Sequence, residues 1–217
     1  YRNHKLASLH QPIAMLLKGI AVFLCLASLA SGVDLVPAPT IQCAGSVSSA
    51  WLDIVFLVDT SAAMTANGLT SANAFIDSVW KQLHTSADDF QWSRFGLISY
   101  ANTATVVRDF SYNSSLPPVA KYSGAAQSDL TSAVSAATSM FVQYPSTHNH
   151  KQVIVIAASA FKSSDELSTA VATFTIGGGT VITVDYIQSG VQSALSSLAT
   201  NGFAFVNDNQ EVHNVIN

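Results

Sequence analysis

Two almost unbroken apolar runs constrain the fold of this chain more than any other feature. Residues 52–58 read LDIVFLV, and residues 153–158 read VIVIAA. A strand with one solvent-facing side alternates apolar and polar residues, whereas a strand buried on both faces is apolar nearly throughout. Both runs have the length of strands, so the sequence predicts two strands that are covered on both faces.

Helical and strand-like segments alternate along the rest of the chain. Apolar residues recur at helical spacing through Leu69, Ala72, Ile76, Val79 and Leu83, and again from Ala126 to Met140. Further helices are expected at 164–174 and 191–198. Further strands are expected at 94–100, 103–110, 180–186 and 203–206, the first two joined as a hairpin.

Strands that alternate with helices of this length favour parallel pairing and right-handed crossovers. The sequence therefore predicts an α/β fold: a three-layer, doubly wound, mostly parallel six-stranded sheet. One edge strand is expected to be antiparallel, with helices on both faces.

The first 32 residues contain an apolar run at 19–29 that is too short to span a bilayer. It follows Lys18 and precedes three small residues, which is typical of a secretory signal peptide; a buried core helix is the alternative. Because Met15 would be a normal start, residues 1–14 are interpreted as an upstream extension. We expect a secreted, extracellular protein with no membrane span in its mature form.

Within this organisation, residues 1–32 are the extension and signal peptide, 33–50 a linker, and 51–217 one domain. Cys25 would leave with the signal, so Cys43 in the linker is expected to form a disulfide with a partner outside this chain. Residues 209–217 resemble the first turns of a helix with no stop signal. We expect that helix to be cut off at Asn217.

The charge balance narrows the possible partners. Acidic residues outnumber basic ones by thirteen to nine, and three of the nine basic residues lie in the first 32, which hold no acidic residue. An acidic surface repels phosphate groups. Nucleic acids and anionic membranes are therefore excluded as expected partners.

A candidate site follows the first predicted strand. In an open parallel sheet, ligands gather at the carboxyl ends of the strands where the strand order reverses. Here that end reads Asp59-Thr60-Ser61. A carboxylate with a hydroxyl two residues later offers two hard oxygens suited to Mg²⁺ or Ca²⁺. Asp59 could equally cap the loop or the next helix.

Residues 51–61 (WLDIVFLVDTS), followed by an amphipathic helix and then 94–100 (RFGLISY), resemble a von Willebrand factor type A (VWA) domain. The resemblance covers about 51–217. With the signal segment and the cysteine before the domain, the chain is most similar to secreted nematode proteins that combine VWA and C-type-lectin domains. The resemblance implies a binding or adhesion module rather than an enzyme.

VWA domains that hold a metal use Asp-x-Ser-x-Ser, then a threonine from a second loop and an aspartate from a third. This resemblance places Asp59 and Ser61 at the first two positions, but Ala63 at the third. Ser128 falls near the threonine position, and Ala158 falls on the last aspartate. Ser159 is next to Ala158, where a shift of one residue is expected to aim its side chain elsewhere.

The resemblance therefore implies a degenerate metal-ion-dependent adhesion site (MIDAS). One carboxylate holds a dication weakly, so we expect weak Mg²⁺ or Ca²⁺ binding or none, and no other cofactor. The predicted ligand-binding residues are Asp59, Thr60, Ser61, Ser128 and Ser159.

Weaker signals have structural interpretations. The pair His148 and His150 is interpreted as part of a solvated loop, and residues 177–179 (GGG) as a helix stop and turn. Trp80 is assigned to the core. Asn113 fits the N-glycosylation rule in a polar loop.

Three functions remain open at this stage. The first is a secreted module that binds an extracellular protein, matrix or glycan ligand, with a C-type-lectin region in the same protein. The second is a purely structural or oligomerisation unit. The third is an unrecognised hydrolase, which is disfavoured because the nucleophile elbow Gly-x-Ser-x-Gly is absent.

Overall fold

The structure is a computed structural model that describes residues 50–83, 85–86, 92–111, 119–159, 161, 164–186 and 194–206. Along the chain these residues form β1 (Leu52–Asp59), η2 (Ala62–Met64), α2 (Thr65–Gln82), β2 (Arg94–Tyr100), β3 (Ala104–Arg108), α3 (Leu130–Gln143), β4 (Lys151–Ala158), α4 (Asp165–Ile176), β5 (Thr180–Asp185), η3 (Ala194–Leu198) and β6 (Ala204–Val206).

The six strands form one sheet in the order β3-β2-β1-β4-β5-β6. All neighbours are parallel except β3, which pairs antiparallel with β2 at the edge. The chain first builds outward from β1 to β3 and then returns to build outward from β4 to β6. This arrangement confirms the predicted fold class, and it puts the reversal of strand order between β1 and β4.

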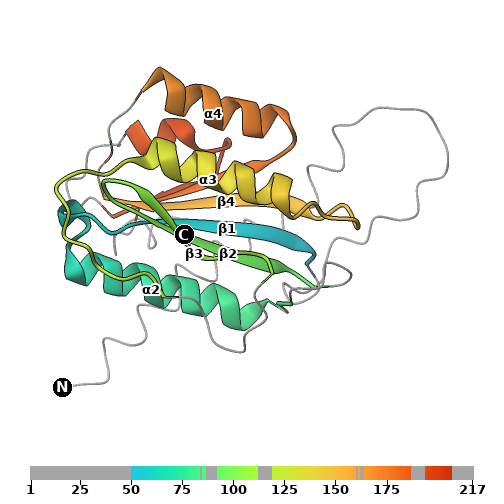
Figure 1. Cartoon of the computed structure of the whole chain (residues 1–217), viewed down its shortest axis with the longest axis horizontal. Helices are drawn as coiled ribbons and strands as arrows, with labels where there is room; N and C mark the ends of the chain where they lie inside the picture. The colour runs from blue at the N-terminus through green and yellow to red at the C-terminus, as the bar shows by residue number, and fades with distance from the viewer. Residues whose placement is uncertain are drawn as a thin grey trace, which may run out of the picture.

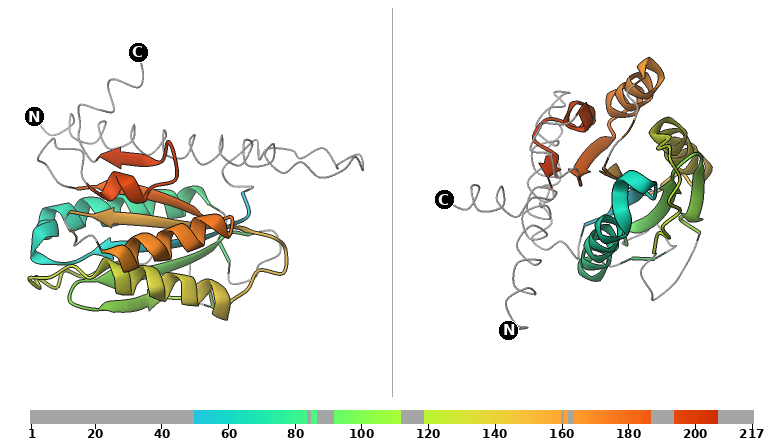
Figure 2. Two further views of the ribbon diagram at one scale, coloured as in Figure 1. Left: turned by 90° about the horizontal axis from the view of Figure 1, so that it is seen from above. Right: turned by 90° about the vertical axis from the view of Figure 1, so that its left-hand side faces the viewer.

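Helices cover both faces of the sheet (Figure 1). α2 lies on one face, whereas α3 and α4 lie on the other, and an end-on view separates the three layers (Figure 2). In β1, Ile54, Phe56 and Val58 belong to the core under α2, and Val55 and Leu57 to the core under α3 and α4. Every residue of β1 is buried, as the unbroken apolar run predicts.

Local capping explains where the helices begin. α3 begins at Leu130 rather than near Ala126, because the Asp129 carboxylate accepts a hydrogen bond from Ser132 N (3.0 Å). α4 begins after Ser164, whose hydroxyl accepts from Leu167 N (3.1 Å). Gly178, with φ +90°, confirms the predicted stop after α4.

Two expected elements differ from the structure. The described part of the predicted helix at 191–198 is the 3₁₀ helix η3 and not an α-helix. β3 is shorter than 103–110, and its pairing with β2 shifts register at Leu97 and Ile98. Within the described residues, no helix has the length and apolarity needed to cross a membrane.

One glycine sets how closely α3 approaches the sheet. A Cβ at Gly96 would lie 2.7 Å from Met140 Sδ on α3 and 3.3 Å from Val55 Cγ2 on β1. A contact of 2.7 Å is shorter than real Cβ atoms show, so a side chain at this position would force Met140 into another conformation or push α3 away from β2. The signal segment, Cys43, Asn113 and the predicted last helix lie outside the described residues.

Candidate functional site

The carboxyl ends of β1 and β4 meet where the strand order reverses, as expected for a ligand site in this kind of sheet. Asp59 ends β1 and is fully buried. Its Oδ1 accepts a hydrogen bond from Ser61 N (2.8 Å), and its Oδ2 accepts one from Ser159 Oγ (3.0 Å). Both carboxylate oxygens are thus bound by uncharged donors.

The expectation that Ser159 points elsewhere is wrong. The side chains of a strand alternate between its two faces, and Ala158 is the last residue of β4. The chain bends at Ser159, so this residue no longer follows the strand alternation. Its side chain points toward Asp59. Ser159 therefore brings a hydroxyl close to the position where the metal-binding pattern has an aspartate.

Two more predicted site residues have buried hydroxyls without a partner. Ser61 Oγ, Ser128 Oγ and the phenol oxygen of Tyr100 are all buried, and each lacks a hydrogen bond of ordinary geometry in the described part of the chain. Burial, and then the negative charge of Asp59, raise the pKa of Tyr100 well above its usual value, and the Ser128 hydroxyl opposes this rise. Asp59 and Ser128 therefore both lie near Tyr100. We call Asp59, Ser61, Tyr100, Ser128 and Ser159 the Asp59 cluster.

Thr60 uses its backbone and its hydroxyl in hydrogen bonds within the chain. Its N–H and its hydroxyl both donate to the carbonyl of Tyr100 (2.8 and 3.0 Å). Its own carbonyl accepts from Ser123 N, Gly124 N and Ser123 Oγ (3.0, 3.2 and 2.8 Å). These bonds hold residues 119–125, which we call the strap, over the end of β1.

The donor set of the Asp59 cluster does not fit a tightly bound divalent cation. Ala63 and Ala158 supply no side-chain oxygen, and the carboxylate of Asp59 is already bound at both oxygens. Mg²⁺ asks for six oxygens in near-octahedral array, and Ca²⁺ for six to eight. The hydroxyls of Ser61, Ser128 and Ser159 are the other serine oxygens of the cluster, so water would have to complete either shell and a single carboxylate would carry the counter-charge.

Sequence reasoning missed a second acidic residue at this end of the sheet. Asp185 ends β5, is buried, and pairs in register with Ala158. Strand alternation puts its side chain on the face that Asp59 also occupies. Its position at the end of a predicted apolar strand could have identified it as a candidate site residue.

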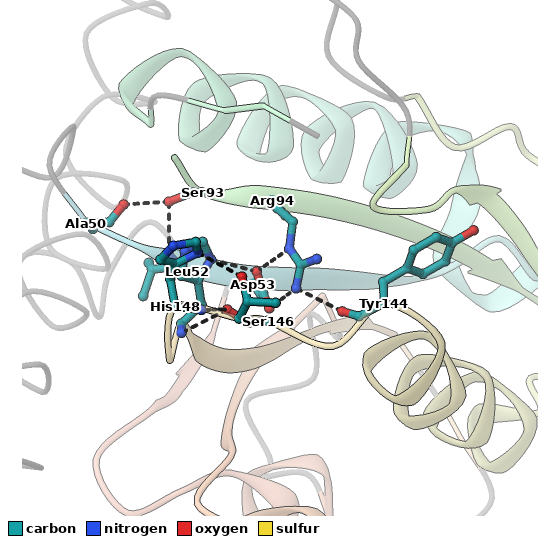
Figure 3. Close-up of polar contacts among 10 residues, drawn as sticks. Ala50, Leu52, Asp53, Ser93, Arg94, Tyr144, Ser146 and His148 are labelled. Atoms are coloured by element: carbon teal, nitrogen blue, oxygen red, sulfur yellow. Dashed lines mark hydrogen bonds and ion pairs between the residues drawn. The ribbon is translucent and has the colours of Figure 1, made fainter. Parts of the chain in front are cut away.

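At the opposite end of the sheet, a third buried aspartate, Asp53, has charged partners. Arg94 binds Asp53 through two hydrogen bonds, Nε to Oδ1 (2.8 Å) and a terminal nitrogen to Oδ2 (2.5 Å), and the same nitrogen donates to the carbonyl of Tyr144 (2.9 Å). His150 Nδ1 lies 3.0 Å from Asp53 Oδ1. Figure 3 shows Arg94 between Asp53 and Tyr144. Asp53, Arg94 and His150 form the Asp53 cluster.

The interpretation of His148 and His150 as a solvated loop is wrong for His150. Its side chain is fully buried because it follows the bend from α3 into β4 and reaches Asp53. The cluster does not resemble a catalytic triad, since Arg94 neutralises Asp53 and His150 Nε2 has no hydrogen-bond partner in the described part of the chain. Nor do the described residues contain any group of three His, Cys, Asp or Glu that could hold a metal ion.

The prediction that Trp80 packs in the core is confirmed. Its ring packs edge-on against Phe95, with 5.2 Å between ring centroids, and Arg108 lies over it at 5.0 Å. It contributes to packing under the sheet and not to the Asp59 cluster.

Comparison with known proteins identifies a matching family and several solved structures with a similar fold. The family model of the von Willebrand factor type A domain matches residues 53–217. Proximal thread matrix protein 1 from the mussel byssus is 13% identical, with a TM-score of 0.60 over 78% of this chain and 46% of its own. The chain thus spans about half the length of that protein. No curated protein matches the chain.

Two further solved structures of similar fold hold a metal ion. The same mussel protein with a zinc-occupied MIDAS motif is 12% identical, with a TM-score of 0.63 over 79% of this chain and 47% of its own. The manganese-loaded Plasmodium vivax TRAP protein is 13% identical, with a TM-score of 0.56 over 79% of this chain and 74% of its own. At these identities the likeness shows the fold alone.

Proposed function

The chain belongs to the von Willebrand factor type A domain family, and from that premise we propose that it is a secreted, non-enzymatic binding module. Its ligand is an extracellular protein, matrix component or glycan. The binding surface is the end of the sheet where β1 and β4 finish, above the Asp59 cluster.

The observation that carries this proposal is the exposed apolar surface on the strap. Val119 and Tyr122 are 56% and 46% exposed, although the neighbouring backbone is fixed to Thr60 by three hydrogen bonds. Exposed aromatic side chains on a rigid backbone are typical anchors of protein interfaces, because little conformational entropy is lost on binding. Lys121, also exposed, adds a positive charge beside them.

We propose that Asp59, Ser61, Ser128 and Ser159 form a degenerate MIDAS beneath this surface. Similar structures hold zinc or manganese, but the donor set here supports only weak binding of Mg²⁺ or Ca²⁺, or none. The cluster then serves mainly to position Thr60 and the strap.

The test is binding of the full chain to arrays of matrix proteins and glycans, with Mg²⁺ and Ca²⁺ or with EDTA. We expect Tyr122→Ala to weaken binding roughly tenfold or more, as for an aromatic anchor. Val142→Ser is the matched control, because Val142 is 81% exposed near the other end of α3. An equal loss in both variants, or no ligand on any array, would favour the purely structural alternative.

The wider context of the module is also proposed from the sequence. This part of the proposal has four elements: secretion through the signal segment at 15–32, glycosylation at Asn113, a disulfide through Cys43, and a C-type-lectin region in the same protein. N-terminal sequencing of secreted material checks the first, and an intact Tyr1 would contradict it. Mass spectrometry before and after glycosidase treatment checks Asn113, and non-reducing gels check Cys43.

A further inference from the structure

The carboxylate of Asp59 is unusual because it is buried without a charged partner. It is fully buried, and no Lys, Arg or His side chain of the described residues forms an ion pair with it. A buried carboxylate is costly unless donors or a cation compensate it. Only two bonds are made, one from the adjacent Ser61 N–H and one from Ser159, which lies 100 residues away in the sequence.

Ser159 supplies the compensation that a cation supplies in a complete MIDAS. Its hydroxyl donates to Asp59 Oδ2 at 3.0 Å, and it follows Ala158, whose side chain has no oxygen. A cation that binds Oδ2 would have to share this oxygen with the Ser159 donor, and would therefore gain less from it. The hydrogen bond also joins the tip of β1 to the tip of β4, which in the sheet are direct neighbours.

From this geometry we infer that the Ser159 hydroxyl is a latch that replaces the metal, so that the end of β1 keeps one arrangement with or without divalent cations. We call this hydrogen bond the Ser159 latch. Ser159 is a positioning residue: it acts on Thr60 and the strap through Asp59. The inference deepens the proposed function and rests on it for its biological meaning, but its test needs no ligand.

The remaining hydroxyls of the cluster make the inference specific. In the described part of the chain Ser61 Oγ makes no hydrogen bond, and Ser128 Oγ faces only the Tyr100 phenol, so both hydroxyls can turn toward a cation at Asp59 Oδ2. Removing the latch should therefore do two things at once. It should weaken the fold in EDTA, and it should create a sensitivity to cations that the unchanged chain lacks.

The test measures the thermal midpoint Tm of the full chain and its variants in EDTA and in about 10 mM MnCl₂, at matched ionic strength. We expect the unchanged chain to differ by less than about 1 °C between the two. Ser159→Ala should lower Tm in EDTA by roughly 3–8 °C, since a buried bond to a charged group is lost. Mn²⁺ should then restore about 3–6 °C, as expected for a site of millimolar affinity.

Two variants separate the latch from general loss of a hydroxyl. Ser159→Thr keeps the donor and should behave like the unchanged chain. Ser123→Ala removes a hydrogen bond of 2.8 Å to the Thr60 carbonyl but leaves Asp59 untouched. It should lower Tm in EDTA and in Mn²⁺ alike.

Any one of three results would overturn the inference. Mn²⁺ could raise the Tm of the unchanged chain as much as it raises that of Ser159→Ala, or it could leave the Tm of Ser159→Ala as unaffected as that of Ser123→Ala. The third such result is a Ser159→Thr variant that behaves like Ser159→Ala. If Ser159→Ala fails to fold, the double variant Asp59→Asn/Ser159→Ala decides. It buries no charge and should fold again, and its failure to do so would also overturn the inference. A loss of ligand binding with an intact Tm pattern would count against the proposed function alone.

Discussion

Strand β1 carries two buried aspartates, one near each end, and the protein compensates them in opposite ways. Asp53 and Asp59 are both fully buried, and strand alternation puts both on the face covered by α3 and α4. Asp53 is bound by Arg94 through two hydrogen bonds and by His150. Asp59 is bound only by a backbone N–H and a serine hydroxyl.

The difference separates a structural carboxylate from a site carboxylate. The Asp53 cluster ties β1 and β2 to the end of α3, because Arg94 also donates to the carbonyl of Tyr144. The Asp59 cluster instead keeps three buried hydroxyls that make no hydrogen bond of ordinary geometry within the described residues, although those of Tyr100 and Ser128 lie near each other. Polar atoms left unpaired in a buried place cost stability, and natural proteins accept that cost mainly where a function requires it.

The largest expected effect is at Asp53. Asp53→Asn leaves the buried Arg94 without its counter-charge, which should lower the free energy of unfolding by about 3–5 kcal/mol. Urea denaturation measures it. The control is Asp77→Asn, which breaks an exposed ion pair of 2.6 Å with Lys81 and should cost less than about 0.5 kcal/mol. A similar small cost at Asp53 would remove the contrast drawn here.

The same substitution at the other aspartate should be mild. In Asp59→Asn, the amide oxygen can still accept from Ser61 N, and the Ser159 hydroxyl can turn to accept from the new NH₂ group. Because a buried charge disappears as well, the free energy of unfolding should change by no more than about 1 kcal/mol. Denaturation under identical conditions gives the comparison, and a loss equal to that of Asp53→Asn would show that Asp59 is structural.

Of the three substitutions, Tyr100→Phe should change the free energy of unfolding least at neutral pH. Its effect should become larger at alkaline pH. The pKa of Tyr100 is raised in the folded state, so its contribution is complete below about pH 10 and is lost as the pH rises further. Burial also raises the pKa of Tyr186. Tyr100→Phe should therefore change stability at pH 7 by less than about 1 kcal/mol and make the alkaline decline shallower.

Unfolding curves between about pH 8 and 12 test this effect. Tyr122→Phe is the control, because Tyr122 is 46% exposed. A decline in Tyr100→Phe as steep as that of the unchanged chain would assign the alkaline transition to Tyr186 or to other groups. The Asp59 cluster would then have no part in it.

Much of the fold could be predicted because burial is recorded in local patterns. The run at 52–58 is apolar at nearly every position since both faces of β1 are covered, and the spacing from Leu69 to Leu83 describes the buried side of α2. Helix starts were less visible. The cap at Asp129 competes with an apolar pattern that begins earlier, so α3 is shorter than its periodicity suggests.

The site was harder to predict because its contacts join distant residues. Ser159 reaches Asp59 across 100 residues, and His150 reaches Asp53 across 97. Neither partner is visible in the local sequence. The resemblance to VWA domains predicted that Asp59, Ser61 and Ser128 lie close together. It could not predict the direction of the Ser159 side chain, because a residue just past the end of a strand is oriented by the bend of the chain there.

Gly96 has a consequence for how this family can change. The residue lies in the middle of β2, far along the sheet from the Asp59 cluster, yet it fixes the gap that Met140 of α3 fills. α3 begins at Leu130 after its N-cap Asp129, so Ser128 lies just before the capped end of this helix. A methyl group at position 96 would have to turn the Met140 side chain aside or shift α3 and the residues before it, so packing within the core bears on the shape of the rim.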